Sequence, residues 1–328
     1  MRRGLVGQTA FGMAVFPIFI VLVFTSEVQA EEWKPTEQIQ FVVPYAPKSK
    51  IDVLARSIVD IIDEGKLCPV PIIVKNEPGS GSTTGTTFVA QAKGNVHMLV
   101  TLISDQVAAP IMAGKGAPTF HDLTPICALI VEEQLIVVKK NSPFKTIKDV
   151  VAAGKQRRLT IGGTPTGQEG QICNRLFERA ADIKIRYIPF KSASECATAL
   201  LAGHVDMIWS NPIEFFPRWE AKMVRSIGVA RETRLPNLPD IPTFKERGYN
   251  ATFEMFRGIA APPGIPLEAV SFYENMMRRM SESSGWKDKF LKQYMLSPYW
   301  LGSQEFIQFL TQNEQLLKSI LTELGLIK

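Results

Sequence analysis

Short apolar runs rich in β-branched residues alternate along the chain with stretches whose apolar positions recur every three or four residues. Ile39–Val43 is a run of the first kind, and a helical pattern begins at Ile51 after Pro44 and Pro47 have interrupted it. The first pattern is typical of buried strands and the second of amphipathic helices. Because strands alternate with helices, the sequence predicts an α/β fold with parallel sheets.

The same alternation continues to the end of the chain. Further strands are expected at Val70–Lys75, Val96–Leu102, Ile126–Val131, Gln134–Lys139, Leu159–Gly162, Lys184–Ile188, Val205–Trp209, Val224–Ala230 and Phe253–Ala261. The last third carries helical patterns at Leu267–Met280, Trp286–Tyr294 and Glu305–Leu324. Because these helices have no strands of their own, we expect them to return and cover the first sheet.

The chain is longer than one hydrophobic core usually organises, so two lobes are expected. Residues 31–125 and 235–328 are assigned to a discontinuous first lobe, and residues 126–234 to a second lobe. The chain would cross between the lobes twice, near Leu123–Val138 and Ala230–Ala261. Two lobes joined by paired crossings can hinge about a cleft.

The first thirty residues have the pattern of an export signal. Arg2 and Arg3 precede the apolar run Phe11–Phe24, and Ala30 supplies the small residue that a signal peptidase needs. The run is short for a membrane span, although an uncleaved N-terminal anchor remains the alternative. We therefore expect a protein that is exported to the periplasm and cleaved near Ala30.

The charge pattern argues against a nucleic-acid partner. The chain has 37 Lys and Arg against 32 Asp and Glu, a formal charge of +5, and both signs are interspersed. That pattern leaves room for a small anionic ligand. His97, His121 and His204 lack the spacing of metal ligands, so neither a metal nor a cofactor is expected.

The four cysteines, Cys68, Cys127, Cys173 and Cys196, could form disulfides in an oxidising compartment. Four cysteines allow three connectivities, and no two of the cysteines have CxxC spacing. Cys173 and Cys196 fall in the same expected lobe, which makes them the favoured pair.

Two stretches have the pattern of an anion site. Ile39–Arg56 passes from a strand through a loop into a helix, and Thr160–Gln171 places Gly162, Gly163 and Gly167 around hydroxyl groups just before another helix. Such joints direct free backbone N–H groups and the positive end of the helix dipole toward one point. An ordinary strand–loop–helix connection would produce the same pattern.

No enzymatic motif is apparent. Asn76–Gly85 is rich in glycine but lacks the lysine of a P-loop and the spacing of the dinucleotide fingerprint, which argues against ATP and NAD. No GxSxG motif is present, and Asp52, Glu169 and Asp206 fit ordinary helix starts and strand ends. The chain is therefore expected not to be an enzyme.

Several motifs in order resemble a known family. PYAPKSKIDVLAR, VKNEPGSGSTTG, LTPICALI, GGTPTGQEGQICNRLF, YIPFKS, LLAGHVDMIWSN, LPDIPTFKERGY and GIAAPPGIP follow one another along nearly the whole chain after residue 30. Together they resemble the periplasmic solute receptors of tripartite tricarboxylate transporters, the TctC or Bug family. The resemblance implies a two-lobed, type II-like periplasmic binding protein that acts as a monomer.

The resemblance also implies a function. Such a receptor captures a small organic anion, usually a carboxylate, in a cleft between its lobes and delivers it to the permease subunits of a tripartite transporter. The alternative is a ligand-sensing co-receptor for a sensor kinase. The positions that match the family's ligand-binding positions are Tyr45, Ala46, Lys48, Ser49, Asp52, Ser104, Gly163, Thr164, Thr166, Gly167, Gln171, Lys191, Ser192, Ser210 and Asn211.

The sequence departs from the family pattern at several of these positions. The family usually has two glycines where this chain has Lys48 and Ser49, and an aspartate where it has Ser210. Because the chain gains a lysine and loses an acid, the site is expected to be more positive than is usual in the family.

Overall fold

The computed structural model describes Met1 and residues 33–114 and 116–327. Trp33–Lys328 forms one compact unit. Apart from Met1, the expected signal peptide lies outside the described residues, so its cleavage stays a prediction.

The strands form two mixed sheets. The first has the order β2-β1-β3-β10-β4-β11 and the second the order β7-β6-β8-β5-β9. The strands of the first sheet are β1 (Ile39–Val43), β2 (Ile72–Asn76), β3 (Met98–Ile103), β4 (Thr124–Glu132), β10 (Met255–Ala261) and β11 (Ser297–Leu301). Those of the second are β5 (Leu135–Lys139), β6 (Leu159–Gly163), β7 (Ile185–Pro189), β8 (Met207–Ser210) and β9 (Val224–Val229).

The prediction of parallel sheets holds for part of each sheet and is wrong for three strands: β5 and β10, which follow the crossings, and β11, which is antiparallel to β4. β1 runs parallel to β2 and β3, and β6 runs parallel to β7 and β8. In contrast, β10 is antiparallel to β3 and β4, and β5 is antiparallel to β8 and β9. β5 and β10 are each the first strand after the chain arrives from the other sheet. They therefore start at the edge of the sheet where the parallel strands end, and run in the reverse direction.

Four of the described helices begin at a short polar side chain that caps them. Ser49, Thr146, Ser192 and Asn211 each accept a hydrogen bond from a backbone N–H in the first turn of the helix that follows. The helices are α1 (Lys50–Glu64), α2 (Thr83–Gln91), α3 (Ser104–Ala113), α4 (Ile147–Gln156), α5 (Glu169–Ala181), α6 (Ala193–Ala202), α7 (Pro212–Glu220), α8 (Leu267–Glu282) and α9 (Ser303–Glu323), with a π-helical segment η4 at Gly285–Leu291.

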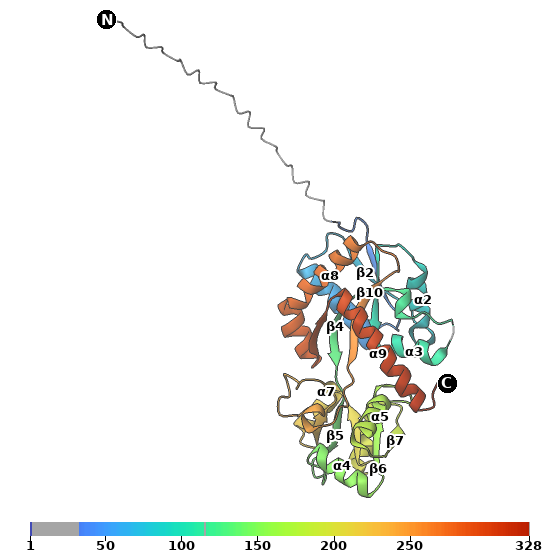
Figure 1. Cartoon of the computed structure of the whole chain (residues 1–328), viewed down its shortest axis with the longest axis vertical. Coiled ribbons are helices and arrows are strands. Elements are labelled where there is room, and N and C mark those ends of the chain that lie inside the picture. Colours follow the sequence, from blue (N-terminus) through green and yellow to red (C-terminus); the bar gives the residue numbers. More distant parts are fainter. Residues whose placement is uncertain (2–32, 115, 328) are drawn as a thin grey trace. The chain divides into compact units, whose positions relative to one another are not determined.

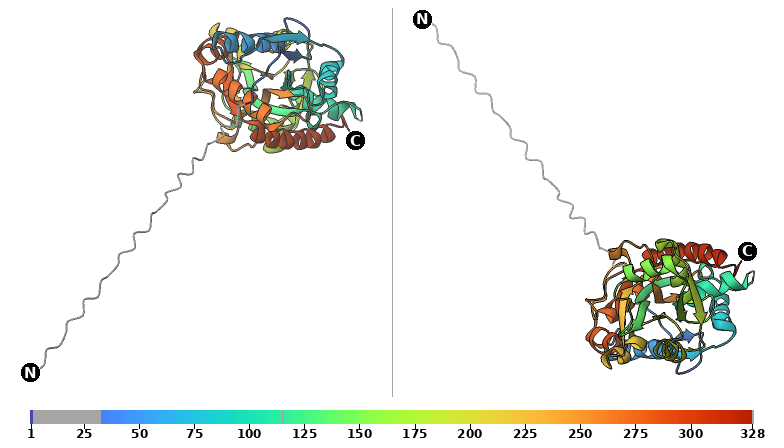
Figure 2. Two further views of the ribbon diagram at one scale, coloured as in Figure 1. Left: turned by 90° about the horizontal axis from the view of Figure 1, so that it is seen from above. Right: turned by 90° about the horizontal axis from the view of Figure 1, so that it is seen from below.

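The C-terminal third covers the first sheet and also contacts the second. α8 and α9 both contact β4, but this third contains a strand as well, β11, which the helical patterns did not predict. Figure 2 shows α9 in red along one side of the compact unit. Near its end, Glu323 accepts hydrogen bonds from Arg175 and Arg179 of α5, at 2.8 and 3.2 Å.

The chain passes from the first sheet to the second at Glu132–Gln134, where β4 leads into β5 (Figure 1). The boundary expected at residue 126 therefore has to move, because β4 pairs with β10 and β11 of the first sheet through Glu132. The return passage runs between β9 and β10. Division into two lobes stays a prediction.

Buried ion pairs join the two passages. Arg257 of β10 pairs with Glu132, and Arg231, just after β9, pairs with Glu133 at 2.8 Å. These four residues are between 1% and 9% exposed. Because successive side chains of an extended segment point to opposite sides, Glu132 and Glu133 reach different partners. Burial raises the pKa of Glu133 to about 7, although its contact with Arg231 opposes that rise.

The predicted disulfide between Cys173 and Cys196 is wrong. All four cysteines are free. Cys173 of α5 packs in the core that includes Ile161 and Met207, whereas Cys196 of α6 packs with Val137 and Ile208 on the other face of the second sheet. The sheet separates the two sulfur atoms.

Replacing Arg231 with methionine should lower the free energy of unfolding by about 3 kcal/mol, because a buried carboxylate is left without its cation. Urea unfolding at pH 8 measures this loss. The double variant Arg231→Met, Glu133→Leu should recover most of it, since both charges are then gone. A single variant as stable as the wild-type protein would contradict this account of the crossing.

Candidate functional site

A cavity of about 310 Å³, the central cavity, lies where strands of both sheets end. Elements of the first sheet contribute Tyr45, Lys50, Ile51, Ile103, Ser104, Asp105, Glu132, Met255, Phe256 and Arg257. The second sheet, its helices and the crossing contribute Gln134, Thr164, Gln168, Glu169, Trp209, Ser210, Asn211 and Glu214. Because β1, β3, β6 and β8 all direct their carboxyl ends toward it, the cavity occupies the usual ligand position of α/β sheets.

Two further cavities adjoin the central cavity. A side cavity of about 190 Å³ shares Tyr45, Asp105 and Glu169 with it, among others. A third cavity of about 280 Å³, here called the basic cavity, shares only Lys50, Glu132 and Arg257. These three side chains therefore form the wall between the central and basic cavities.

The predicted site residues divide into three groups. The central cavity brings together Tyr45, Ser104, Thr164, Ser210 and Asn211. Gly167 lines the side cavity and Lys48 lines the basic cavity. The remaining candidates line none of these cavities: Ala46, Ser49, Asp52, Gly163, Thr166, Gln171, Lys191 and Ser192. A ligand role for this last group stays a prediction.

Asp52 holds the first loop in shape. Its carboxylate accepts hydrogen bonds from the Lys48 backbone N–H at 2.7 Å, from Arg56 at 3.1 Å and from Asn76 at 2.9 Å. Burial opposes ionisation of this carboxyl, but these hydrogen bonds hold its pKa below the ordinary value. Lys48 has a φ of 66°, a conformation that favours glycine.

The turn after β6 is likewise held by its own side chains. Gln171 accepts a hydrogen bond from the Gly167 backbone N–H at 2.7 Å, and Thr164 accepts one from Gly170 at 3.2 Å. A side chain at Gly163 would lie 2.5 Å from the Tyr187 hydroxyl. Gly163 therefore makes room for Tyr187, and Gln171 supports the turn that carries Glu169.

Buried polar groups in the central cavity have unused hydrogen-bonding capacity. Gln134 is 3% exposed, and the contact that its side chain makes is a 3.7 Å approach to the Met255 sulfur. Trp209 is 4% exposed, and its indole N–H has no partner among the described residues. Ser210 has only a 3.5 Å contact to the next carbonyl. A ligand with oxygen acceptors would satisfy these groups.

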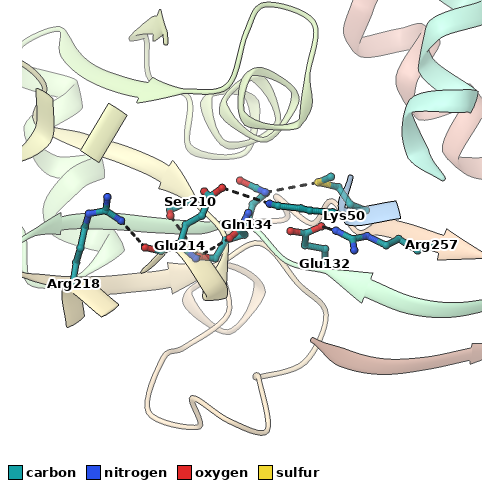
Figure 3. A network of polar contacts seen from close by, with 9 residues as sticks. Lys50, Glu132, Gln134, Ser210, Glu214, Arg218 and Arg257 are labelled. Atoms are coloured by element: carbon teal, nitrogen blue, oxygen red, sulfur yellow. Dashed lines mark hydrogen bonds and ion pairs between the residues drawn. The ribbon is translucent and has the colours of Figure 1, made fainter. Parts of the chain in front are cut away.

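One ion pair connects the two sides of the cavity, and a second lies within the first sheet (Figure 3). Lys50 at the start of α1 reaches Glu214 of α7 at 3.7 Å, and Arg257 pairs with Glu132. Glu214 is further fixed through its backbone, because its N–H donates to Asn211 and its carbonyl accepts from Arg218. Lys50 therefore ties the first sheet's helix to the second sheet's helix across the cavity.

Two other carboxyl groups of the central cavity, Asp105 and Glu169, have no side-chain hydrogen-bond partner among the described residues. Burial raises the pKa of Glu169 to about 7, and the neighbouring carboxylates of Asp105, Glu132 and Glu214 add to the rise. The pKa of Asp105 is raised as well, by desolvation from the surrounding protein and by the carboxylate of Glu132, although the residue is exposed at the surface. The central cavity thus holds more carboxyl groups than cations. The expectation of a site more positive than is usual in the family stays a prediction.

Sequence reasoning missed several charged residues of the central cavity: Lys50, Asp105, Glu132, Glu169, Glu214 and Arg257. Glu169 was expected to be an ordinary helix start, and it does begin α5, but it also lines the cavity. One signal could have identified Glu132: the polar triplet Glu132–Gln134 interrupts two strongly apolar runs. Asp206, in contrast, is structural as expected, because it pairs with Arg157 at 2.7 Å.

In residues 33–114 and 116–327, no cluster of His, Cys, Asp or Glu could hold a metal ion. Over those ranges, no helix has the length and hydropathy that a membrane crossing requires.

Two α/β sheets linked by paired crossings, with a polar cavity between their strand ends, define a solute-binding protein of the periplasmic type. The family model described as "Tripartite tricarboxylate transporter family receptor" (TctC) matches residues 55–326. The chain belongs to this family, whose members are periplasmic solute-binding receptors rather than enzymes.

Individual relatives match this chain over most of its length. The protein "UPF0065 protein in gbd 5'region" of Cupriavidus necator is 25% identical over 100% of this chain and 97% of its own length. The crystal structure of a TctC solute-binding protein from Polaromonas has a TM-score of 0.82 at 24% identity, covering 88% of this chain and 99% of that one. MatC from Rhodopseudomonas palustris, solved with bound malate, has a TM-score of 0.64 at 22% identity, with 87% and 99% covered.

Replacing Glu169 with glutamine should stabilise the protein at pH 8 by about 2–3 kcal/mol, because a carboxyl whose folded pKa lies near 7 costs stability when it is ionised. The unfolded carboxyl titrates near 4.5, so the wild-type protein binds more protons when folded and loses stability as pH rises from about 4.5 to 7. The difference in free energy of unfolding between the variant and the wild-type protein should therefore become smaller toward pH 5. Urea unfolding of both proteins at pH 5 and pH 8 tests this, and a difference that does not depend on pH would refute it.

Proposed function

We propose that this protein captures a small organic acid in the central cavity and delivers it to the membrane subunits of a tripartite tricarboxylate-type transporter. The observation that carries the proposal is the set of buried, underused hydrogen-bonding groups at Gln134, Trp209 and Ser210, beside the Arg257 guanidinium. Carboxylate oxygens match such groups. Malate in the related MatC structure supports this class of ligand.

Capture would involve closure of two lobes about the crossings. Tyr45, Ser104 and Arg257 come from elements of the first sheet, and Thr164, Ser210 and Asn211 from the second. A ligand that contacts both groups favours the arrangement in which they face each other. The ion pair between Lys50 and Glu214 would favour the same arrangement. Transport further requires export, with removal of residues 1–30.

A thermal-shift screen against mono-, di- and tricarboxylates should identify the ligand, because binding to the native state raises the melting temperature by mass action. Cells that lack the protein should then lose uptake of that acid. If uptake is unchanged while a transcriptional response to the acid is lost, the protein is a sensor and the transport proposal fails.

Replacing Ser210 with alanine should weaken binding of the identified acid about tenfold, since one hydrogen bond to a charged group contributes about 1.5 kcal/mol. Isothermal titration calorimetry measures the change. Thr146→Ala is the matched control: Thr146 caps α4 and lines none of the three cavities, so its loss should cost stability and leave affinity unchanged. If Ser210→Ala binds the acid with the affinity of the wild-type protein, Ser210 is not part of the site.

Affinity for the acid should rise as pH falls from 8 to 6. Protonation of Glu169, whose pKa lies near 7, removes a negative charge that repels a bound carboxylate. Titration calorimetry should also show proton uptake on binding near pH 7. In Glu169→Gln both effects should largely disappear, and a wild-type affinity that falls at pH 6 would contradict this reasoning.

A further inference from the structure

The basic cavity differs in chemistry from the central cavity. Its charged lining consists of Lys48, Lys50 and Arg257 against the single carboxylate of Glu132, which is already paired with Arg257. The central cavity has four carboxyl groups against two cations. The formal charge of the basic cavity's lining is therefore positive, whereas that of the central cavity is negative when its four carboxyl groups are ionised.

Arg257 supplies a buried anion-binding group in the wall of this cavity. The residue is 9% exposed, and of its five N–H donors only one, on Nη2, has a partner in the part of the chain that the structure describes. Figure 3 shows Arg257, Glu132 and Lys50 close together, and all three line both cavities. A carboxylate in the basic cavity would satisfy the remaining donors.

The rest of the lining is apolar and rigid. Phe290 and Leu296 are 6% and 7% exposed, and Tyr294 and Ile213 are half-buried. The Phe290 ring stacks on Trp286 and packs against Tyr294, with centroids 4.9 Å apart in both pairs. Phe290 also lies in the π-helical segment η4, a kind of segment found frequently at functional sites. A flat apolar group fits against such a wall.

We propose that the basic cavity is a second ligand site, which binds a small monocarboxylate carrying an aromatic ring. The carboxylate lies against Arg257 and Lys48, and the ring lies against Phe290, Tyr294 and Leu296. A volume of about 280 Å³ is at the small end of ligand pockets and suits a compound with one ring. This site adjoins the central cavity of the proposed function and shares Arg257 with it, but its other ligand contacts are its own.

Phenylacetate is the probe, and 2-phenylacetamide is its uncharged control. With methyl-labelled protein, phenylacetate should shift the NMR signals of Val53, Ile213 and Leu296, which line the basic cavity. The signals of Ile51 and Ile103, which line the central cavity, should move less. Phenylacetamide should bind at least tenfold more weakly. Absence of shifts at millimolar phenylacetate, or equal binding of the amide, would overturn the proposal.

Two variants locate the site. Tyr294→Ala and Lys48→Gly should each weaken phenylacetate binding at least fivefold. Glycine suits the backbone at residue 48, so this variant removes a charge without straining the loop. Both variants should retain the wild-type melting temperature and should bind the acid of the central cavity normally. A variant that melts early is replaced by Tyr294→Leu or Lys48→Gln.

The central-cavity variant Ser210→Ala separates the two proposals. It should leave phenylacetate binding unchanged, whatever its effect on the acid of the central cavity. If Ser210→Ala abolishes phenylacetate binding while Tyr294→Ala does not, the aromatic acid occupies the central cavity and the second site does not exist.

Discussion

The buried ion pairs at the crossing between the sheets are the constraint on which the remaining structure depends. Glu132 and Glu133 lie in the segment that joins β4 to β5, so this segment is extended. It is also buried, because sheets and helices surround it. Buried carboxylates require cations. Arg257 and Arg231 supply them from the return passage, so the two crossings are tied to each other and their positions define the cavity walls.

The same pairing gives the two larger cavities opposite characters. Glu132 and Arg257 form a wall that both cavities share, with Lys50 beside them. On one side of this wall, Asp105 and Glu169 make the cavity acidic. On the other side, Lys48 and an aromatic surface make it basic and apolar. A single layer of side chains thus separates two environments that favour different ligands.

Helix starts in this protein serve structure as much as binding. A helix N-terminus attracts anions, which is why the loops after β1 and β6 predict ligand contacts. Here the chain satisfies many of those N–H groups itself. Ser49 and Asp52 hold the first loop, Gln171 holds the turn after β6, and Glu169 brings its own carboxyl group to the start of α5. The spare hydrogen-bonding capacity lies elsewhere, at Gln134 and Ser210.

The sequence by itself determined the α/β class, most strands and helices, the family, and some cavity residues such as Tyr45, Thr164 and Asn211. Periodicity, caps and motif order are local properties, so they can be read along the chain. Only the tertiary structure decided the antiparallel strands, the free cysteines, and the charges of the central cavity. The reason is sequence separation: Arg257 and Glu132 are 125 residues apart, and no local pattern records which side chain a buried charge will meet.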